Sequence, residues 1–391
     1  MILNDGELGL YVHIPFCKSK CYYCDFNSYA SKEYLISSYC EALIKEIEYY
    51  GNLAGTNRKP GEHYNSYQIK SIYLGGGTPT HIPPQFILQI IEKCRNNFFI
   101  KDEAEITLEA NPGTLSDEKL EVYRNAGVNR LSIGLQAWQD RLLKMLGRIH
   151  NVQDFISNVN AAQKLGIGNI SVDLIFGLPM QTLDEWFQTL DEVLKLNIMH
   201  LSCYSLKVEE DTVLEEKIRK GELPVPDEDI DREMYHNTIL KLKSKGFKHY
   251  EISNFSKPGF ESRHNLIYWK AEEYIGLGAG AHSYFEGKRY NNEVKPEKYI
   301  SEIQKGNIPM RNIVSLSEKD RICEFLILGL RLTDGVDTQE FKNKFGKDLF
   351  ELYGANVDIL IKRGLLEIEG EIIRLTPLGL DLANQVFIEF I

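Results

Sequence analysis

The sequence lacks several features that define broad classes of protein. It has no apolar run approaching the ~20 residues that a membrane-spanning helix needs. Its first residues, Met1-Ile-Leu-Asn-Asp-Gly-Glu7, show neither the basic nor the apolar region of a secretory signal. Lys and Arg number 45 against 56 Asp and Glu, a formal net charge of -11, which argues against general binding to nucleic-acid phosphates. We therefore expect a cytoplasmic protein that neither spans a membrane nor binds nucleic acid.

Cysteine is sparse over most of the chain. The odd total of seven does not suit the disulfide framework of a secreted protein. Four cysteines occur singly and are expected to be small, reduced, buried side chains: Cys40, Cys94, Cys203 and Cys323. With 391 residues, 43% of them hydrophobic, the chain is long enough for one large domain and a smaller one.

The other three cysteines form the motif C-x3-C-x2-C at Cys17, Cys21 and Cys24, and no fourth cysteine follows nearby. Iron–sulfur clusters of four irons are normally held by four cysteine thiolates. Three ligands on one loop would leave one iron open to a small molecule. A closed zinc site needs four ligands, usually in two cysteine pairs, and the second pair is missing here. The motif therefore predicts a [4Fe–4S] cluster with one open iron.

Short apolar segments alternate with amphipathic ones for most of the chain. Strands are expected at 8–14, 69–74, 105–109, 130–135, 170–175 and 200–206, with a weaker one at 249–254. Helices are expected at 85–98, 117–125, 152–165 and 186–196, with Ser116, Asn151 and Thr182 as caps. This alternation implies right-handed crossovers and a parallel sheet. We predict an α/β fold, a partial (β/α)6 TIM-like barrel.

Polar or glycine motifs follow successive strands of this barrel. Ligands of such barrels sit at the carboxyl ends of the strands, and glycine lets a ligand approach the backbone closely. Each feature alone is more often a turn or a satisfied polar group. Their alignment predicts one shared pocket, built from the cysteine loop, Gly75-Gly76-Gly77-Thr78-Pro79, Glu109-Ala-Asn111-Pro112, Gln136 and Asp173.

Eight motifs, spread over nearly the whole chain, carry a resemblance to a known family. They are Tyr11-Val-His-Ile-Pro-Phe-Cys17, Gly75-Gly-Gly-Thr78-Pro-Thr80, Leu108-Glu109-Ala-Asn111-Pro-Gly113, Ile133-Gly-Leu-Gln136, Val172-Asp-Leu-Ile-Phe-Gly-Leu-Pro179, Tyr250-Glu-Ile-Ser-Asn-Phe255, His264-Asn265-Leu-Ile-Tyr268-Trp269 and Gly278-Ala-Gly-Ala-His-Ser283. With them the chain resembles the coproporphyrinogen-oxidase branch of the radical S-adenosylmethionine (SAM) superfamily. That branch includes the oxygen-independent oxidases, HemN, and the heme chaperones, HemW.

The resemblance implies cofactors and their ligands. Cys17, Cys21 and Cys24 would hold the [4Fe–4S] cluster, whose open iron binds the amino and carboxylate groups of SAM. The implied SAM contacts are Tyr11, Tyr23, Gly76, Gly77, Thr78, Glu109, Gln136, Arg148 and Asp173. A carboxylate can bind ribose hydroxyls and a guanidinium can pair with a carboxylate. For Arg148 a basic residue on the surface is the less favoured alternative. No residue is assigned a catalytic role.

Phe26 favours the chaperones over the oxidases. The oxidases resemble C-x3-C-x2-C-x-C, and Phe26 stands where their extra cysteine lies. They also carry a longer segment before the motif, where this chain has sixteen residues. The resemblance implicates the motif at His264 in heme binding, with the imidazole as an axial ligand. A hydrogen-bonded core histidine beside aromatic side chains is the alternative.

The chain changes character after about residue 315. Helices are expected at 318–332, 338–345 and 349–362, then a hairpin at 365–375 and a final helix opened by Thr376-Pro377. Three helices and a hairpin predict a winged-helix-like domain. It has no basic stripe, so a lid or packing role is preferred to DNA binding. We expect a radical SAM barrel at 1–245, a connecting region at 246–315 and this domain at 316–391.

The function that these expectations favour is heme handling. A chaperone would bind heme and pass it to an acceptor protein, possibly a respiratory one, and would act as a monomer or weak dimer. The alternative is an oxygen-independent coproporphyrinogen III oxidase, in which a radical derived from SAM abstracts hydrogen from a propionate side chain. A SAM-and-cluster protein with another substrate is a third possibility. Whether SAM is turned over is left open by the sequence.

Overall fold

Six parallel strands lie side by side in the order in which they occur in the chain. A computed structural model describes residues 6–53 and 67–391. The strands are β1 (Glu7–Ile14), β2 (Gln68–Gly76), β3 (Phe99–Ala110), β4 (Arg130–Gln136), β5 (Asn169–Phe176) and β6 (His200–Ser205). Each neighbouring pair is parallel, which requires a crossover between strands. Each overlaps its expected range, and the predicted α/β barrel is confirmed.

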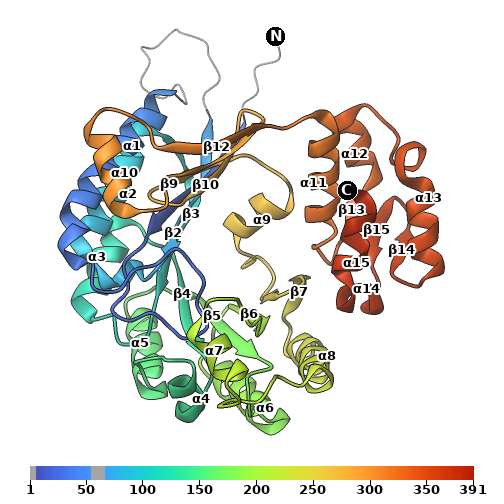
Figure 1. Cartoon of the computed structure of the whole chain (residues 1–391), viewed down its shortest axis with the longest axis horizontal. Coiled ribbons are helices and arrows are strands. Elements are labelled where there is room, and N and C mark those ends of the chain that lie inside the picture. The colour runs from blue at the N-terminus through green and yellow to red at the C-terminus, as the bar shows by residue number, and fades with distance from the viewer. Residues whose placement is uncertain (1–5, 54–66) are drawn as a thin grey trace.

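Helices form the crossovers and cover the outer face of the strands (Figure 1). They are α1 (Ile36–Leu53), α2 (Pro84–Asn97), α3 (Asp117–Ala126), α4 (Asp140–Met145), α5 (Val152–Lys164) and α6 (Leu183–Leu194). Two further helices, α7 (Val213–Arg219) and α8 (Glu228–Ser244), follow β6. Ser116 caps α3 as expected, and Asn151 and Thr182 form capping boxes with the third residue of α5 and α6. Local side-chain chemistry therefore determines where these helices begin.

The sheet continues beyond both edges of the barrel. In the described residues it has 12 strands, in the order β12-β11-β10-β9-β1-β2-β3-β4-β5-β6-β8-β7. The added strands are β7 (Lys248–Glu251), β8 (Asn254–Ser256), β9 (Tyr274–Leu277), β10 (His282–Phe285), β11 (Lys288–Asn292) and β12 (Met310–Ser315). Two helices lie among them, α9 (Arg263–Trp269) and α10 (Pro296–Gln304).

One expectation for this region needs correction. The single strand expected at 249–254 is wrong, because the chain reverses there and β7 and β8 pair as an antiparallel hairpin. The connecting region expected at 246–315 includes β9, which pairs in parallel with β1. The expected boundary at 245 stays a prediction, but the sheet itself extends past it.

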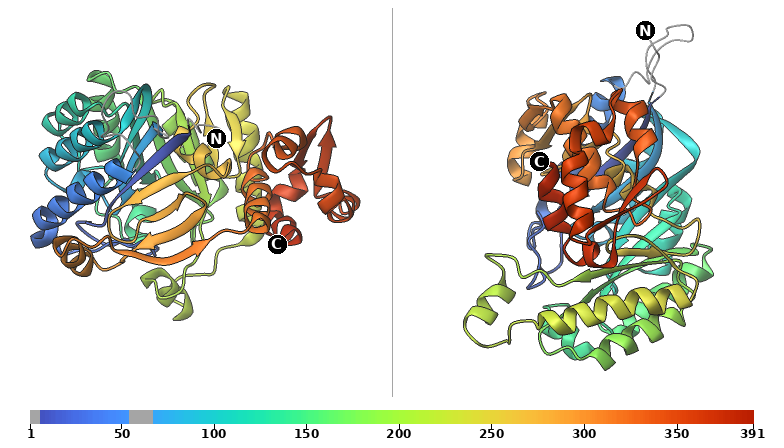
Figure 2. Two further views of the ribbon diagram at one scale, coloured as in Figure 1. Left: turned by 90° about the horizontal axis from the view of Figure 1, so that it is seen from above. Right: turned by 90° about the vertical axis from the view of Figure 1, so that its right-hand side faces the viewer.

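The residues after 315 form a separate module beside the barrel (Figure 2). It contains α11 (Glu318–Gly329), α12 (Thr338–Phe345), α13 (Leu349–Lys362), β13 (Val336–Asp337), β14 (Leu366–Glu369), β15 (Ile372–Leu375), α14 (Pro377–Asp381) and α15 (Ala383–Phe387). The expected three helices and hairpin are present. The hairpin gains β13 as a third strand, and the expected final helix is broken in two at Leu382. Phe341 and Leu360 are among the buried side chains of its own apolar core.

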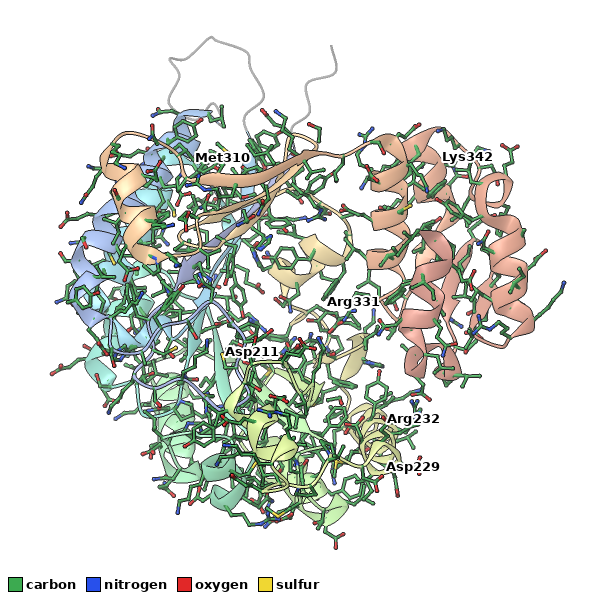
Figure 3. The ribbon with its side chains drawn as sticks, in the orientation of Figure 1. Asp211, Asp229, Arg232, Met310, Arg331 and Lys342 are labelled. Atoms are coloured by element: carbon green, nitrogen blue, oxygen red, sulfur yellow. The ribbon has the colours of Figure 1, made fainter. Side chains whose placement is uncertain are left out.

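Ion pairs join this module to the barrel. Arg289 on β11 binds Glu324 on α11 at 2.5 and 2.8 Å. Arg331, labelled at the junction in Figure 3, lies 3.9 Å from Glu251 and 4.5 Å from the centre of the Trp269 ring. These contacts hold α11 beside α9.

A buried carboxylate ties α1 to the added strands. Glu46 is inaccessible to solvent and accepts hydrogen bonds from Gly278 N at 2.7 Å, Asn292 Nδ2 at 2.6 Å and Tyr299 OH at 2.6 Å. Burial raises the pKa of Glu46 to about 7. Three groups that lie 232 to 253 positions away from Glu46 in sequence therefore depend on its side chain.

Across residues 6–53 and 67–391, no helix combines the length and the apolar character needed to cross a bilayer.

Candidate functional site

A cavity of about 480 Å³ lies at the carboxyl ends of the barrel strands. It brings together all but two of the predicted site residues. They are Cys17, Cys21, Tyr23, Cys24, Gly76, Gly77, Thr78, Glu109, Gln136, Arg148 and Asp173. A larger groove of about 770 Å³ runs along α6 and contains none of them. These residues therefore meet at the carboxyl ends of the strands, as expected for a TIM-like barrel.

A chain of hydrogen bonds connects two of the three cysteines. Thr78 Oγ1 donates to Cys17 Sγ at 3.5 Å and accepts from Asn111 Nδ2 at 2.8 Å. Arg148 continues the chain, donating to Asn111 Oδ1 at 2.7 Å and to Cys21 Sγ at 3.4 Å. Hydrogen-bond donors beside sulfur stabilise a thiolate. The sequence places Asn111 in the pocket motif that follows β3, but only the structure shows its hydrogen bonds to Thr78 and Arg148.

The cysteine thiols can bind metal only after they lose their protons. Burial raises the pKa of Cys17 and of Cys24, so both are neutral in the free protein. Metal binding must then release protons. No three His, Cys, Asp or Glu side chains in the described parts of the chain converge on a single ion. Three cysteines lining one cavity instead fit a multi-iron cluster, in which each thiolate binds a different iron.

The glycine triplet is required by packing as well as by any ligand. Gly76 has φ of +110°, and a Cβ there would lie 2.4 Å from the His13 ring. A Cβ on Gly77 would lie 2.9 Å from the Ile14 carbonyl oxygen, to which the Gly77 N–H donates. The end of β1, just before the cysteine loop, thus packs directly on the end of β2 and leaves no room for side chains there.

Two carboxylates face the cavity from β3 and β5. Glu109 accepts from Tyr73 OH at 2.8 Å and Gly76 N at 3.0 Å, and burial raises its pKa to about 7. Asp173 accepts from Ser132 Oγ at 3.2 Å, and burial raises its pKa as well. Neither carboxylate has an ion-pair partner within 4 Å among the described residues, so both can accept from a ligand.

Two further predicted residues complete the lining. Gln136 ends β4 with φ of +74°, a conformation that is uncommon for non-glycine residues. The Nε atom of Arg148 is buried and has no hydrogen-bond partner in the described structure. A buried guanidinium with an unused donor fits an anionic group such as the carboxylate of SAM.

Tyr11 lies in a second cavity, of about 550 Å³. The two cavities share Phe26, Gly76 and Glu109 as lining residues. The hydroxyl of Tyr11 is 2.9 Å from Nδ1 of His13. Tyr11 could meet SAM only across the wall that the two cavities share. Its contact with SAM therefore stays a prediction.

His264 lines neither cavity. Its side chain is 1% exposed, with Nδ1 2.8 Å from Ser71 Oγ and Nε2 2.8 Å from Tyr268 OH. Burial lowers its pKa to about 3. Iron could bind His264 only by displacing Ser71 or Tyr268. The arrangement is that of a hydrogen-bonded core histidine, the alternative to the predicted heme ligand.

Comparison with known proteins is consistent with this arrangement. Residues 11–193 match the model of the radical SAM superfamily, and residues 316–382 match that of the HemN C-terminal domain. The chain is 38% identical over 384 residues to heme chaperone HemW of Bacillus subtilis, covering 97% of this chain and 98% of the relative. It is 37% identical over 381 residues to heme chaperone HemW of Lactococcus lactis, covering 97% and 96%.

Two less similar proteins also match nearly the whole chain. Radical S-adenosyl methionine domain-containing protein 1, mitochondrial, of Bos taurus is 33% identical over 394 residues, covering 98% of this chain and 87% of the relative. The solved structure of coproporphyrinogen III oxidase HemN from Escherichia coli is 22% identical and superposes with a TM-score of 0.84, covering 100% of this chain and 91% of that one. At this identity the superposition shows a common fold.

Proposed function

Because this chain belongs to the HemW family of radical SAM proteins, we propose that it is a heme chaperone, which binds heme and passes it to an acceptor protein. The observation that supports the chaperone over the oxidase is Phe26. Its side chain is 64% exposed and lines both cavities, at the position where the oxidases carry a further cysteine. A phenyl ring can neither donate a proton nor carry an electron as a thiol does.

The family implies a [4Fe–4S] cluster and SAM as cofactors. In the proposed arrangement Cys17, Cys21 and Cys24 hold the cluster. The cluster supplies an open iron for SAM and an electron when it is reduced. Glu109 and Asp173 accept hydrogen bonds from SAM, and the buried Arg148 pairs with its carboxylate. Gly76, Gly77, Thr78, Gln136 and Tyr23 form the remaining walls.

The two carboxylates give a direct test of the SAM site. Glu109→Ala and Asp173→Ala should each weaken SAM binding by about one to two decades, because loss of a charge-assisted hydrogen bond typically costs about 1.5–3 kcal/mol. SAM affinity is measured from the spectral change of the reduced cluster, and iron content should stay constant. Asp191→Ala, an exposed change on α6 outside the cavity, is the control. Wild-type SAM affinity in both cavity variants would show that these carboxylates serve only the fold.

The oxidase remains the second candidate, because the structure of HemN superposes on this chain over its whole length. As a chaperone, the protein with its cluster should bind heme stoichiometrically and form no protoporphyrinogen IX from coproporphyrinogen III. The assay is anaerobic, with SAM, a reductant and the porphyrinogen, and is followed by porphyrin fluorescence. Multiple turnovers with SAM consumed would replace the chaperone proposal with the oxidase.

The acceptor and the location belong to the same proposal. The proposed partner is an acceptor protein, for which a respiratory protein is one candidate, and the proposed location is the cytoplasm. Heme-loaded and heme-free protein are each incubated with separated cell fractions. Co-purification of the heme-loaded protein with one fraction tests the acceptor and the location together.

A further inference from the structure

The second cavity has the volume and the lining of a cofactor pocket. Its volume of about 550 Å³ lies within the ~300–1,000 Å³ of small-molecule sites. Phe26, Tyr268, Trp269 and Tyr274 supply aromatic surface, and Leu328 of α11 lines it from the C-terminal module. Aromatic walls of this kind suit a large flat ring system such as a porphyrin.

Most side chains here that could bind iron are already hydrogen-bonded. The hydroxyl of Tyr11 is 2.9 Å from Nδ1 of His13, and Nε2 of His13 is 2.8 Å from the carbonyl oxygen of Asn27. The carboxylates of Glu109 and Glu272 also have hydrogen-bond donors. Binding iron through any of these groups would break an existing contact.

The remaining phenols are engaged in the same way. The Tyr268 hydroxyl is 2.8 Å from Nε2 of the buried His264, and the Tyr274 hydroxyl accepts from Arg289 Nη1 at 3.3 Å. Among the residues that the structure describes, no cysteine or methionine lines this cavity, and one candidate ligand is left.

That candidate is His282, the first residue of β10. Its backbone pairs with Asn291, and its side chain is exposed while lining the cavity. No residue in 6–53 or 67–391 hydrogen-bonds its ring. Gly278 and Gly280 in the preceding turn have φ of +98° and +77°, and a Cβ on Gly280 would meet the Asn27 side chain at 2.4 Å. The turn that presents His282 is thus packed against the cysteine loop.

We propose that His282 is the axial ligand of heme iron in this cavity, an assignment that rests on the proposed heme-chaperone function. Neutral imidazole is a common axial ligand of heme. A ligand at the exposed rim leaves the heme accessible to a ligand of the acceptor protein. His264, enclosed behind Tyr268, supports the wall of the pocket without contacting iron.

The test uses the full chain with its cluster reconstituted anaerobically, titrated with hemin and followed at the Soret band. His282→Ala and His282→Gln should weaken hemin binding by about a hundredfold or more, because even loss of a group behind a metal ligand typically costs about 10- to 100-fold in affinity. The Soret band of residual complex should shift, and added imidazole should restore it. Thermal unfolding of both variants checks that they fold.

Two matched variants complete the experiment. His81→Ala, which lines neither cavity and whose ring is partnered only by Glu33 at 3.4 Å in the described structure, should bind hemin as the wild type does. His264→Ala should keep the wild-type Soret position. Hemin binding by both His282 variants with wild-type affinity and spectrum would overturn the ligand assignment alone. A wild-type protein that binds no hemin would overturn the proposed function together with it.

Discussion

Replacing any one of Cys17, Cys21 and Cys24 by alanine is expected to abolish the [4Fe–4S] cluster. All three line one cavity, and a cluster that already lacks a fourth cysteine cannot lose another ligand and persist. Reconstituted wild-type protein should carry close to one cluster per chain. Each variant should lose the broad visible absorption and most of its iron, as measured by absorption spectroscopy and iron analysis.

The other four cysteines provide the matched controls. Cys40, Cys94 and Cys203 are buried in the core, and burial raises the pKa of both Cys40 and Cys94 to about 12. Cys323 lies 3.7 Å from Tyr353 OH in the C-terminal module. Alanine at each position should leave iron content unchanged. A cluster that survives loss of Cys21, or disappears with loss of Cys94, would refute the ligand assignment.

Glu46→Ala is expected to lower the free energy of unfolding by about 3–5 kcal/mol. Gly278 N, Asn292 Nδ2 and Tyr299 OH would each lose a buried acceptor, at about 1–3 kcal/mol per unsatisfied group. Urea unfolding followed by circular dichroism measures the loss. Glu48→Ala on the same helix removes only a surface pair with Lys93 and should cost at most about 1 kcal/mol. Equal losses of unfolding free energy in the two variants would show that the buried network adds nothing to stability.

The same residue predicts a pH dependence. Burial raises the pKa of Glu46 to about 7, above its ordinary value of 4.5, so the folded state binds the proton more tightly than the unfolded state. Folding then takes up a proton between about pH 4.5 and 7, and the contribution of Glu46 to stability falls as pH rises through that window. In Glu46→Gln this contribution should be independent of pH. A wild-type pH profile of unfolding that matches the Glu46→Gln profile would contradict the prediction.

Much of the barrel can be predicted from the sequence because its signals are local. Asn151 and Thr182 cap the helices that they precede, since a cap acts within three residues of itself. Cys17, Cys21 and Cys24 likewise lie on one loop, so their spacing is a local signal. The alternation of strands and helices then implies the parallel order, and with it the edge of the sheet where ligand residues gather.

Contacts between distant segments could not be predicted in this way. The added strand β9 joins β1 across most of the chain, and neither its pairing nor the hairpin of β7 and β8 has a periodic signature. Asn111 acquires its role from Thr78, which follows β2, and from Arg148, which follows α4. A short strand reveals its own pattern but not its partner.

The two histidines show the same division most clearly. By itself the sequence determined that His264 and His282 occur in motifs beside aromatic and glycine residues. Only the tertiary structure decided that Ser71 and Tyr268 occupy both nitrogens of His264 while the ring of His282 is exposed at the rim of a cavity. The reason is physical: whether an imidazole can bind a metal depends on hydrogen bonds and burial, and here those are supplied by residues as far as 193 positions away.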